Sequence, residues 1–139
     1  MNADGHKSEI DRVTEKIIGC AFTVGNSLGC GFLEKIYENS LVIELRKQGL
    51  RVAQQQIMEV RYDDILVGTY VADVVVEEIV LIEIKAVKFF DEIHKAQCLN
   101  YLKANGLPIC LLIIFGRPRV DIKRVILTTE PSSPSVLHL

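Results

Sequence analysis

The spacing of apolar residues changes along this chain, and the change limits the folds it can adopt more than any single motif does. Up to about residue 48, apolar residues recur three and four positions apart, which is typical of amphipathic helices. From residue 50 the spacing becomes two, which indicates strands, and residues 109–115 then form a fully apolar run. The sequence therefore predicts helices, then antiparallel strands, then a strand buried on both faces.

Two helices are expected before the first strand. Ser8, with Asp11 three residues later, resembles a capping box that begins a helix ending at Leu28, where Gly29 interrupts the pattern. A second amphipathic helix is predicted over residues 32–48. Its apolar side chains are expected to face inward: Leu33, Ile36, Tyr37, Leu41 and Leu45.

A three-stranded antiparallel meander is predicted over residues 51–62, 65–76 and 79–86. A helix over residues 92–105 then leads to the apolar strand at residues 109–115, and such a unit is expected to be a right-handed crossover between parallel strands. The predicted fold is therefore α/β, with helices, a meander, a crossover helix and a parallel strand in one mixed sheet flanked by helices.

The end of the chain carries one more predicted strand, over residues 120–127, and a polar tail at residues 128–139 that is expected to be flexible. Residues 1–127 are expected to form a single domain, because 49% of the 139 residues are hydrophobic and can fill a core.

The net charge of −2 excludes a protein that coats nucleic acid by bulk attraction. The charge is uneven, however, since residues 1–79 carry −5 and residues 80–127 carry +4. Any contact with nucleic acid is therefore expected from a local patch in the second half. Its basic side chains can offer a phosphate-binding surface, with Lys88 and Lys95 as the substrate-binding candidates, and the alternative is an ordinary solvated face: Lys88, Lys95, Lys103, Arg117, Arg119, Lys123 and Arg124.

The cellular setting is predicted from cysteine usage and apolar runs. The four cysteines show no metal-type spacing and are interpreted as reduced thiols. The N-terminus has no apolar signal core, and the run at residues 107–115 is too short to cross a bilayer. A cytoplasmic protein without membrane association is therefore expected, and its small size and apolar content are compatible with a homodimer.

Three charged residues fall within the predicted apolar strands. Glu83 and Lys85 are two positions apart and share a face with Leu81, while Asp73 lies on the preceding strand. Charges in an apolar sheet are costly unless they pair with one another or bind a metal ion. These residues are therefore the candidate site, and the competing interpretation is a structural ion pair between Glu83 and Lys85.

The pairing of the second and third strands decides between these interpretations. A two-residue turn after Val76 would place Asp73 opposite Ile82, away from Glu83. A three-residue connection, or a bulge, would pair Val76 with Val80 and Asp73 with Glu83. The turn sequence Glu-Glu lacks the Gly or Asn that a tight hairpin prefers, which favours the longer connection.

In the second arrangement, two adjacent carboxylates repel unless a cation joins them, and Mg²⁺ or Mn²⁺ with oxygen ligands is the expected cofactor. Lys85 can then orient or deprotonate an attacking water, or stabilise charge on a phosphorane. Gln97 and Tyr101 lie four apart on the crossover helix, hence on one face. Gln97 can position the water or the phosphate, and Tyr101 can donate to a phosphate oxygen.

The segment GCGFLEKIYENSL contains Gly31, Glu34 and Tyr37 and resembles the motif after which the GxxExxY proteins are named. The segments YVADVVVEEIVLIEIKAV and IHKAQCLNYL are similar to later blocks of that family, so the resemblance covers roughly residues 10–127. GxxExxY proteins in turn resemble the PD-(D/E)xK nuclease superfamily. The resemblance implies a restriction-endonuclease-like core that runs helix, three strands, helix, strand.

The resemblance also implies roles for individual residues. Asp73 and Glu83 are implied to bind the metal, Lys85 to be the catalytic lysine, and Glu34 to add a carboxylate to the site. Without the family, Glu34 would be interpreted as a charge that complements the helix dipole. Gln97, four residues before a tyrosine, belongs to a segment similar to the QxxxY element of an exonuclease branch of the superfamily.

The expected function is metal-dependent hydrolysis of phosphodiester bonds in nucleic acid, with DNA as the expected substrate. One alternative is a non-catalytic module that binds nucleic acid or protein and keeps the nuclease fold. Another is an assembly subunit whose apolar sheet edge serves dimerisation, with a merely structural polar cluster. Fold analogy alone does not decide between them.

Overall fold

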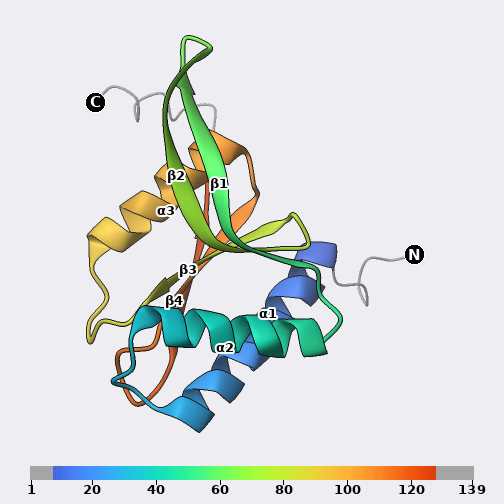
Figure 1. Ribbon diagram of the computed structural model, residues 1–139, viewed down its shortest axis with the longest axis vertical. Coiled ribbons are helices and arrows are strands. Elements are labelled where there is room, and N and C mark those ends of the chain that lie inside the picture. The colour runs from blue at the N-terminus through green and yellow to red at the C-terminus, as the bar shows by residue number, and fades with distance from the viewer. Residues whose placement is uncertain (1–7, 128–139) are drawn as a thin grey trace.

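The computed structural model describes residues 8–127, and its elements follow the predicted order (Figure 1). The predicted flexible tail at residues 128–139 lies outside the described residues. In chain order the elements are α1 (Glu9–Leu28), α2 (Glu34–Lys47), β1 (Val52–Tyr62), β2 (Ile65–Val76), β3 (Val80–Lys85), α3 (Glu92–Asn105), β4 (Ile109–Ile114) and β5 (Asp121–Ile126).

The strands form one mixed sheet in the order β1-β2-β3-β4-β5. β1, β2 and β3 pair antiparallel, as the predicted meander requires. α3 carries the chain from β3 to β4, which pair in parallel, and β5 returns antiparallel to β4. The predicted α/β fold, with a mixed sheet and flanking helices, is confirmed.

Helices cover both faces of the sheet, and the strand period assigns side chains to them. Val74, Ile82 and Ile84 belong to the apolar core against α1 and α2. Val75 and Leu81, one position out of phase, belong to a second core against α3. Figure 1 shows α1 and α2 grouped together and α3 apart from them, beside the middle of β1 and β2. The face under α3 is the one that Glu83 and Lys85 share with Leu81.

The connection between β2 and β3 has the longer of the two predicted forms. Val76 pairs with Val80, and the amide of Ile79 donates to the carbonyl of Val76 over 3.0 Å. Glu77 and Glu78 adopt left-handed backbone angles, with φ of 55° and 58°. Left-handed φ is uncommon for residues other than glycine. The same register, continued along both strands, places Asp73 opposite Glu83.

β1 and β2 extend past the end of β3 as a two-stranded ribbon, which projects at the top of Figure 1. On one side the ribbon packs on α3 through Tyr70, whose ring stacks on Tyr101 at a centroid distance of 4.0 Å. The Tyr70 hydroxyl donates to the Tyr101 carbonyl over 3.2 Å and accepts from the Asn105 amide over 2.8 Å. These contacts fix the angle between the ribbon and α3.

The inward face of α2 differs from the predicted one. Tyr37 and Leu41 are buried as expected, but Leu33 is 75% exposed and Ile36 is 39% exposed. The helix begins at Glu34, and Leu33 precedes it as an N-cap without a side-chain hydrogen bond. Glu34 is three residues before Tyr37 and seven before Leu41, so it lies on their stripe. An acidic residue therefore takes the place that the apolar pattern assigned to Leu33 and Ile36.

Within the described residues, no helix has the length and apolar character that a membrane crossing needs. The cysteines are free thiols, with Cys20, Cys98 and Cys110 buried and Cys30 exposed. The single domain, the cytoplasmic location and the homodimer stay predictions.

Replacing Gly116 with alanine should destabilise the fold. The Phe115 amide donates to the Lys85 carbonyl over 2.8 Å, and an added Cβ at Gly116 would overlap the Val87 backbone. We expect Gly116→Ala to lower the free energy of unfolding by about 1–3 kcal/mol. Gly19→Ala is the matched control, since nothing lies within 4 Å of its added Cβ and alanine favours the helix interior. Urea denaturation checks both, and equal stabilities would contradict the close packing.

Candidate active site

The candidate site lies where Asp73 on β2 meets the carboxyl-terminal half of β3. The Ile84 amide donates to Asp73 Oδ2 over 2.9 Å, and the Asp73 amide lies 3.4 Å from Glu83 Oε2. Glu83 is 6% exposed, and Asp73 is half-buried. Each carboxylate thus touches the backbone of the facing strand. The two predicted metal ligands are side by side.

A local change in β2 presents Asp73 at this position. Ala72 belongs to the core under α3, whereas Val74 belongs to the core under α1 and α2. In a regular strand, residues two apart share a face, so the strand is irregular at Asp73. On β1, Gln54 pairs with Val74, and the next residue, Gln55, has a left-handed φ of 55°. The two neighbouring strands are thus distorted at the level of the carboxylates.

A buried carboxylate that the sequence interpretation missed holds this distortion in place. Glu38 on α2 is 4% exposed, and both of its oxygens accept from Gln55 Nε2 at 3.0 Å. Gln54 Nε2 donates to Glu38 Oε2 over 2.7 Å, and Lys35 Nζ lies 3.2 Å from Oε1. The charge of Glu38 also contributes to raising the pKa of Asp73, after burial, the leading cause. Glu38 therefore acts on the site both through β1 and through its charge.

A signal for Glu38 exists in the sequence. Glu38 is four residues after Glu34 and next to the buried Tyr37, so it lies on the stripe that faces the sheet. Two glutamines at positions 54 and 55 supply the amide donors that a buried carboxylate needs. The sequence interpretation missed Glu38 and its glutamine partners because it expected only apolar residues on this stripe.

Glu34 also reaches the site, as the family resemblance implied. Glu34 Oε2 accepts from the amide of Ala86 over 3.2 Å, just after the end of β3. Its side chain is exposed, and its charge is among the causes that raise the pKa of Asp73. The first residue of α2 therefore places a further carboxylate just after the end of β3.

The site is strongly acidic, and burial changes the proton affinity of its members. Burial, followed by the neighbouring charge of Asp73, raises the pKa of Glu83 to about 8. Burial likewise raises the pKa of Asp73, although the hydrogen bond from the Ile84 amide opposes the change. The positive charge of Lys85 lowers the pKa of both carboxyls. A cation between the carboxylates would relieve their desolvation and repulsion.

Lys85 ends β3 and lies half-buried on the same face as Glu83. The structure therefore brings Asp73, Glu83 and Lys85 together, with Glu34 beside them.

The other predicted site residues lie on α3 and in the segment before it. Tyr101 is half-buried against Tyr70, and burial, followed by the charge of Glu83, raises its pKa. Gln97 is half-buried one turn earlier on the same helix. Lys88 and Lys95 are exposed, one in the segment after β3 and the other on α3. Their roles toward a substrate stay predictions.

The donor set fits a small divalent ion. Asp73 and Glu83 offer adjacent hard oxygen ligands, and Mg²⁺ is commonly held by one or two carboxylates while it keeps several waters. Among residues 8–127, no group of three or more His, Cys, Asp or Glu side chains has the arrangement that would hold a metal ion by itself. Such a site suits a hydrated Mg²⁺ or Mn²⁺ ion better than tetrahedral Zn²⁺, which takes three or four protein ligands.

Comparison with known proteins supports the fold and its family. A family model described as the PD-(D/E)XK nuclease superfamily matches residues 11–125. A solved structure, the crystal structure of SSO0001, has a TM-score of 0.51 with 15% sequence identity over 76% of this chain. The match covers 59% of the SSO0001 chain, and at this identity it shows the fold alone. No curated protein matches the chain significantly.

The metal-free protein should lose stability as the pH rises toward 8. Glu83 has a folded-state pKa of about 8 against an ordinary value of 4.5, so the folded state holds a proton that the unfolded chain releases. Its contribution is therefore full below 4.5 and is lost as the pH rises through about 8. Urea denaturation with a chelator checks this, and Glu83→Gln should flatten the dependence. An unchanged slope in that variant would contradict the assignment.

Removing the amide of Gln55 should destabilise the fold. Gln55→Ala removes a hydrogen-bond donor to the buried Glu38, so we expect the free energy of unfolding to fall by about 2 kcal/mol. Alanine does not relieve the left-handed φ at this position. Gln55→Gly should fall between this variant and the native protein, because glycine tolerates that φ. Gln56→Ala, at an exposed position, is the control. If Gln55→Ala and Gln56→Ala are equally stable, Glu38 does not depend on Gln55.

Proposed function

The chain belongs to the PD-(D/E)XK nuclease superfamily, and we propose that it hydrolyses phosphodiester bonds in nucleic acid, with DNA as the substrate and Mg²⁺ or Mn²⁺ as the cofactor. The observation that carries the proposal is the pairing of Asp73 with Glu83. Asp73 Oδ2 lies 2.9 Å from the Ile84 amide, and Glu83 Oε2 lies 3.4 Å from the Asp73 amide, with Lys85 on the same face. Membership of a nuclease superfamily favours a catalytic role for this cluster over that of a structural ion pair.

In this proposal Asp73 and Glu83 hold the divalent ion. When bound, such an ion polarises a phosphate oxygen and lowers the pKa of a water molecule. Lys85, two residues after Glu83 on the same face of β3, orients the attacking water and stabilises the negative charge that develops on the phosphoryl oxygens. Burial strengthens these interactions because the surroundings have a low dielectric constant.

Within the superfamily, we propose that the chain is of the GxxExxY type, and the geometry supports a role for each motif residue. Gly31 has a φ of 108°, which favours glycine, and so lets the chain turn before α2. The Tyr37 hydroxyl donates to the Gly29 carbonyl over 2.7 Å and accepts from the Phe32 amide over 3.2 Å. The motif thus fixes the start of α2, and Glu34 is set at the end of β3 as a further carboxylate for water or metal.

The residues of α3 are proposed to contact the substrate. Gln97 positions the phosphate or the attacking water, and Tyr101 donates from its hydroxyl to a phosphate oxygen. The stacking of Tyr70 on Tyr101 limits the orientations of this ring, which favours a defined contact. Lys88 and Lys95, both exposed, add positive charge for the nucleic-acid backbone.

A second candidate function is a module that binds nucleic acid without cleaving it. It is the alternative that the family match leaves open, because a shared fold does not by itself establish turnover. Such a module would keep the carboxylates and bind Mn²⁺ without turnover. Calorimetry with Mn²⁺, run beside a cleavage assay, distinguishes the two functions.

Cleavage of DNA with Mg²⁺ or Mn²⁺ should require the carboxylates and the lysine. We expect Asp73→Asn and Lys85→Ala each to lower the rate by at least about a hundredfold, because each removes metal binding or charge stabilisation. Linear, nicked, single-stranded and branched DNA, together with RNA of the same sequence, are the substrates. Lys47→Gln is the control, because Lys47 is exposed at the end of α2 and pairs with Glu44. Native rates in both site variants would refute the proposal.

A further inference from the structure

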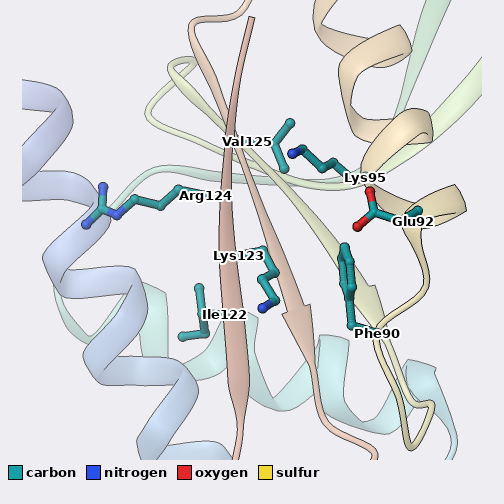
Figure 2. A pocket seen from close by; sticks show the side chains of 7 residues that line it. All are labelled: Phe90, Glu92, Lys95, Ile122, Lys123, Arg124 and Val125. Atoms are coloured by element: carbon teal, nitrogen blue, oxygen red, sulfur yellow. The ribbon is translucent and has the colours of Figure 1, made fainter.

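A cavity of about 470 Å³ opens between the start of α3 and strand β5, away from the carboxylates. Figure 2 shows Lys123 and Val125 of β5 on the side of Phe90, Glu92 and Lys95. The lining combines three apolar residues with three basic residues and one acidic residue. Its residues are Phe90, Glu92, Lys95, Ile122, Lys123, Arg124 and Val125.

The Lys123 ammonium group is held in the cavity by the Phe90 ring. Its Nζ lies 5.1 Å from the centroid of the Phe90 ring, within reach of a cation–π interaction. Its contact with Asp121 is 4.0 Å long between side chains that are 45% and 37% exposed, and such pairs contribute little. The ammonium group of Lys123 is therefore held over the Phe90 ring and is not neutralised by a strong ion pair with Asp121.

Arg124 contacts helix α1 instead of the α3 side of the cavity. Its Nη1 lies 3.5 Å from the Thr14 hydroxyl on α1, and in Figure 2 its side chain extends toward that helix, away from Phe90. The basic groups left on the α3 side are Lys123 and Lys95. Glu92, in the first turn of α3, is the acidic group that opposes them.

The sheet register relates this cavity to the candidate active site. Glu83 pairs with Leu112, and Leu112 pairs with Lys123, so the three residues form one row across β3, β4 and β5. Leu112 belongs to the core under α3, and paired residues share a face, so Glu83 and Lys123 lie on the same side of the sheet. Two strand spacings separate them by roughly 10 Å. A nucleic-acid strand covers that distance in about three nucleotides at B-form rise.

We propose that this cavity binds an internal phosphodiester group of the nucleic-acid strand, a few nucleotides from the bond that is cleaved. The proposal rests on the proposed function, because it takes the strand to lie across the carboxylates. Lys123 and Lys95 donate to the phosphate oxygens, and Phe90 holds the Lys123 ammonium in place. Glu92 repels the phosphate and weakens its binding. The cavity therefore adds affinity along the strand and takes no part in the chemical step.

Binding of a fluorescein-labelled single-stranded DNA, followed by anisotropy with a chelator present, tests the cavity without turnover. We expect Lys123→Gln to weaken binding by about tenfold, as for one lost charge-assisted contact, and to lower the salt dependence by about 0.7. Lys95→Gln should act in the same direction, and Glu92→Gln should tighten binding. Lys47→Gln, at a distant exposed site, is the matched control.

The outcomes separate this proposal from the proposed function. If Lys123→Gln binds DNA with native affinity while Asp73→Asn loses cleavage, the cavity does not bind the strand and the nuclease function still stands. An equal loss in Lys47→Gln would mean that bulk charge governs binding, which also overturns the proposed role of the cavity. An effect confined to strands with a 5′-phosphate would overturn the internal position of the bound group. Thermal melting of each variant checks that the fold is retained.

Discussion

Two carboxylates that face each other inside an apolar sheet are the constraint on which this structure depends. Asp73 and Glu83 each contact the backbone of the facing strand, and their proximity is costly without a cation. The left-handed connection at Glu77 and Glu78 aligns the two strands so that these side chains meet. A shift of one residue in this pairing would move one carboxylate to the opposite face and leave the other alone in the core.

Helix α2 supports this arrangement from the side. Glu34 and Glu38 are one turn apart on its inward stripe, the first bound to the Ala86 amide and the second to the amides of β1. The Tyr37 hydroxyl ties the same turn to the loop before it. Hydrogen bonds to ionised groups are the stronger ones, so these contacts set the position of α2 against the sheet as well as the charge of the site.

Much of this fold could be predicted from periodicity, because helices and strands bury different stripes of the same sequence. The order of elements and the crossover at α3 follow from apolar spacing alone. The choice of the longer connection after Val76 rested on a weak negative signal, the absence of Gly or Asn. Glu38 escaped prediction because its stripe of α2 was expected to be apolar. The distortion at Gln55 escaped prediction because a left-handed glutamine depends on tertiary partners that no local propensity encodes. The approach of Lys123 to Phe90 is likewise a product of the folded sheet.

The β1–β2 ribbon has a consequence for how the site responds to distant change. Asp73 lies at the base of the ribbon and also belongs to the carboxylate pair. Any tilt of the ribbon relative to the sheet therefore displaces one carboxylate, while Glu83 on β3 stays fixed. The ring stack between Tyr70 and Tyr101 connects the ribbon to α3 and resists that tilt. The tyrosines are therefore part of the mechanical frame that keeps the spacing of the two acids constant.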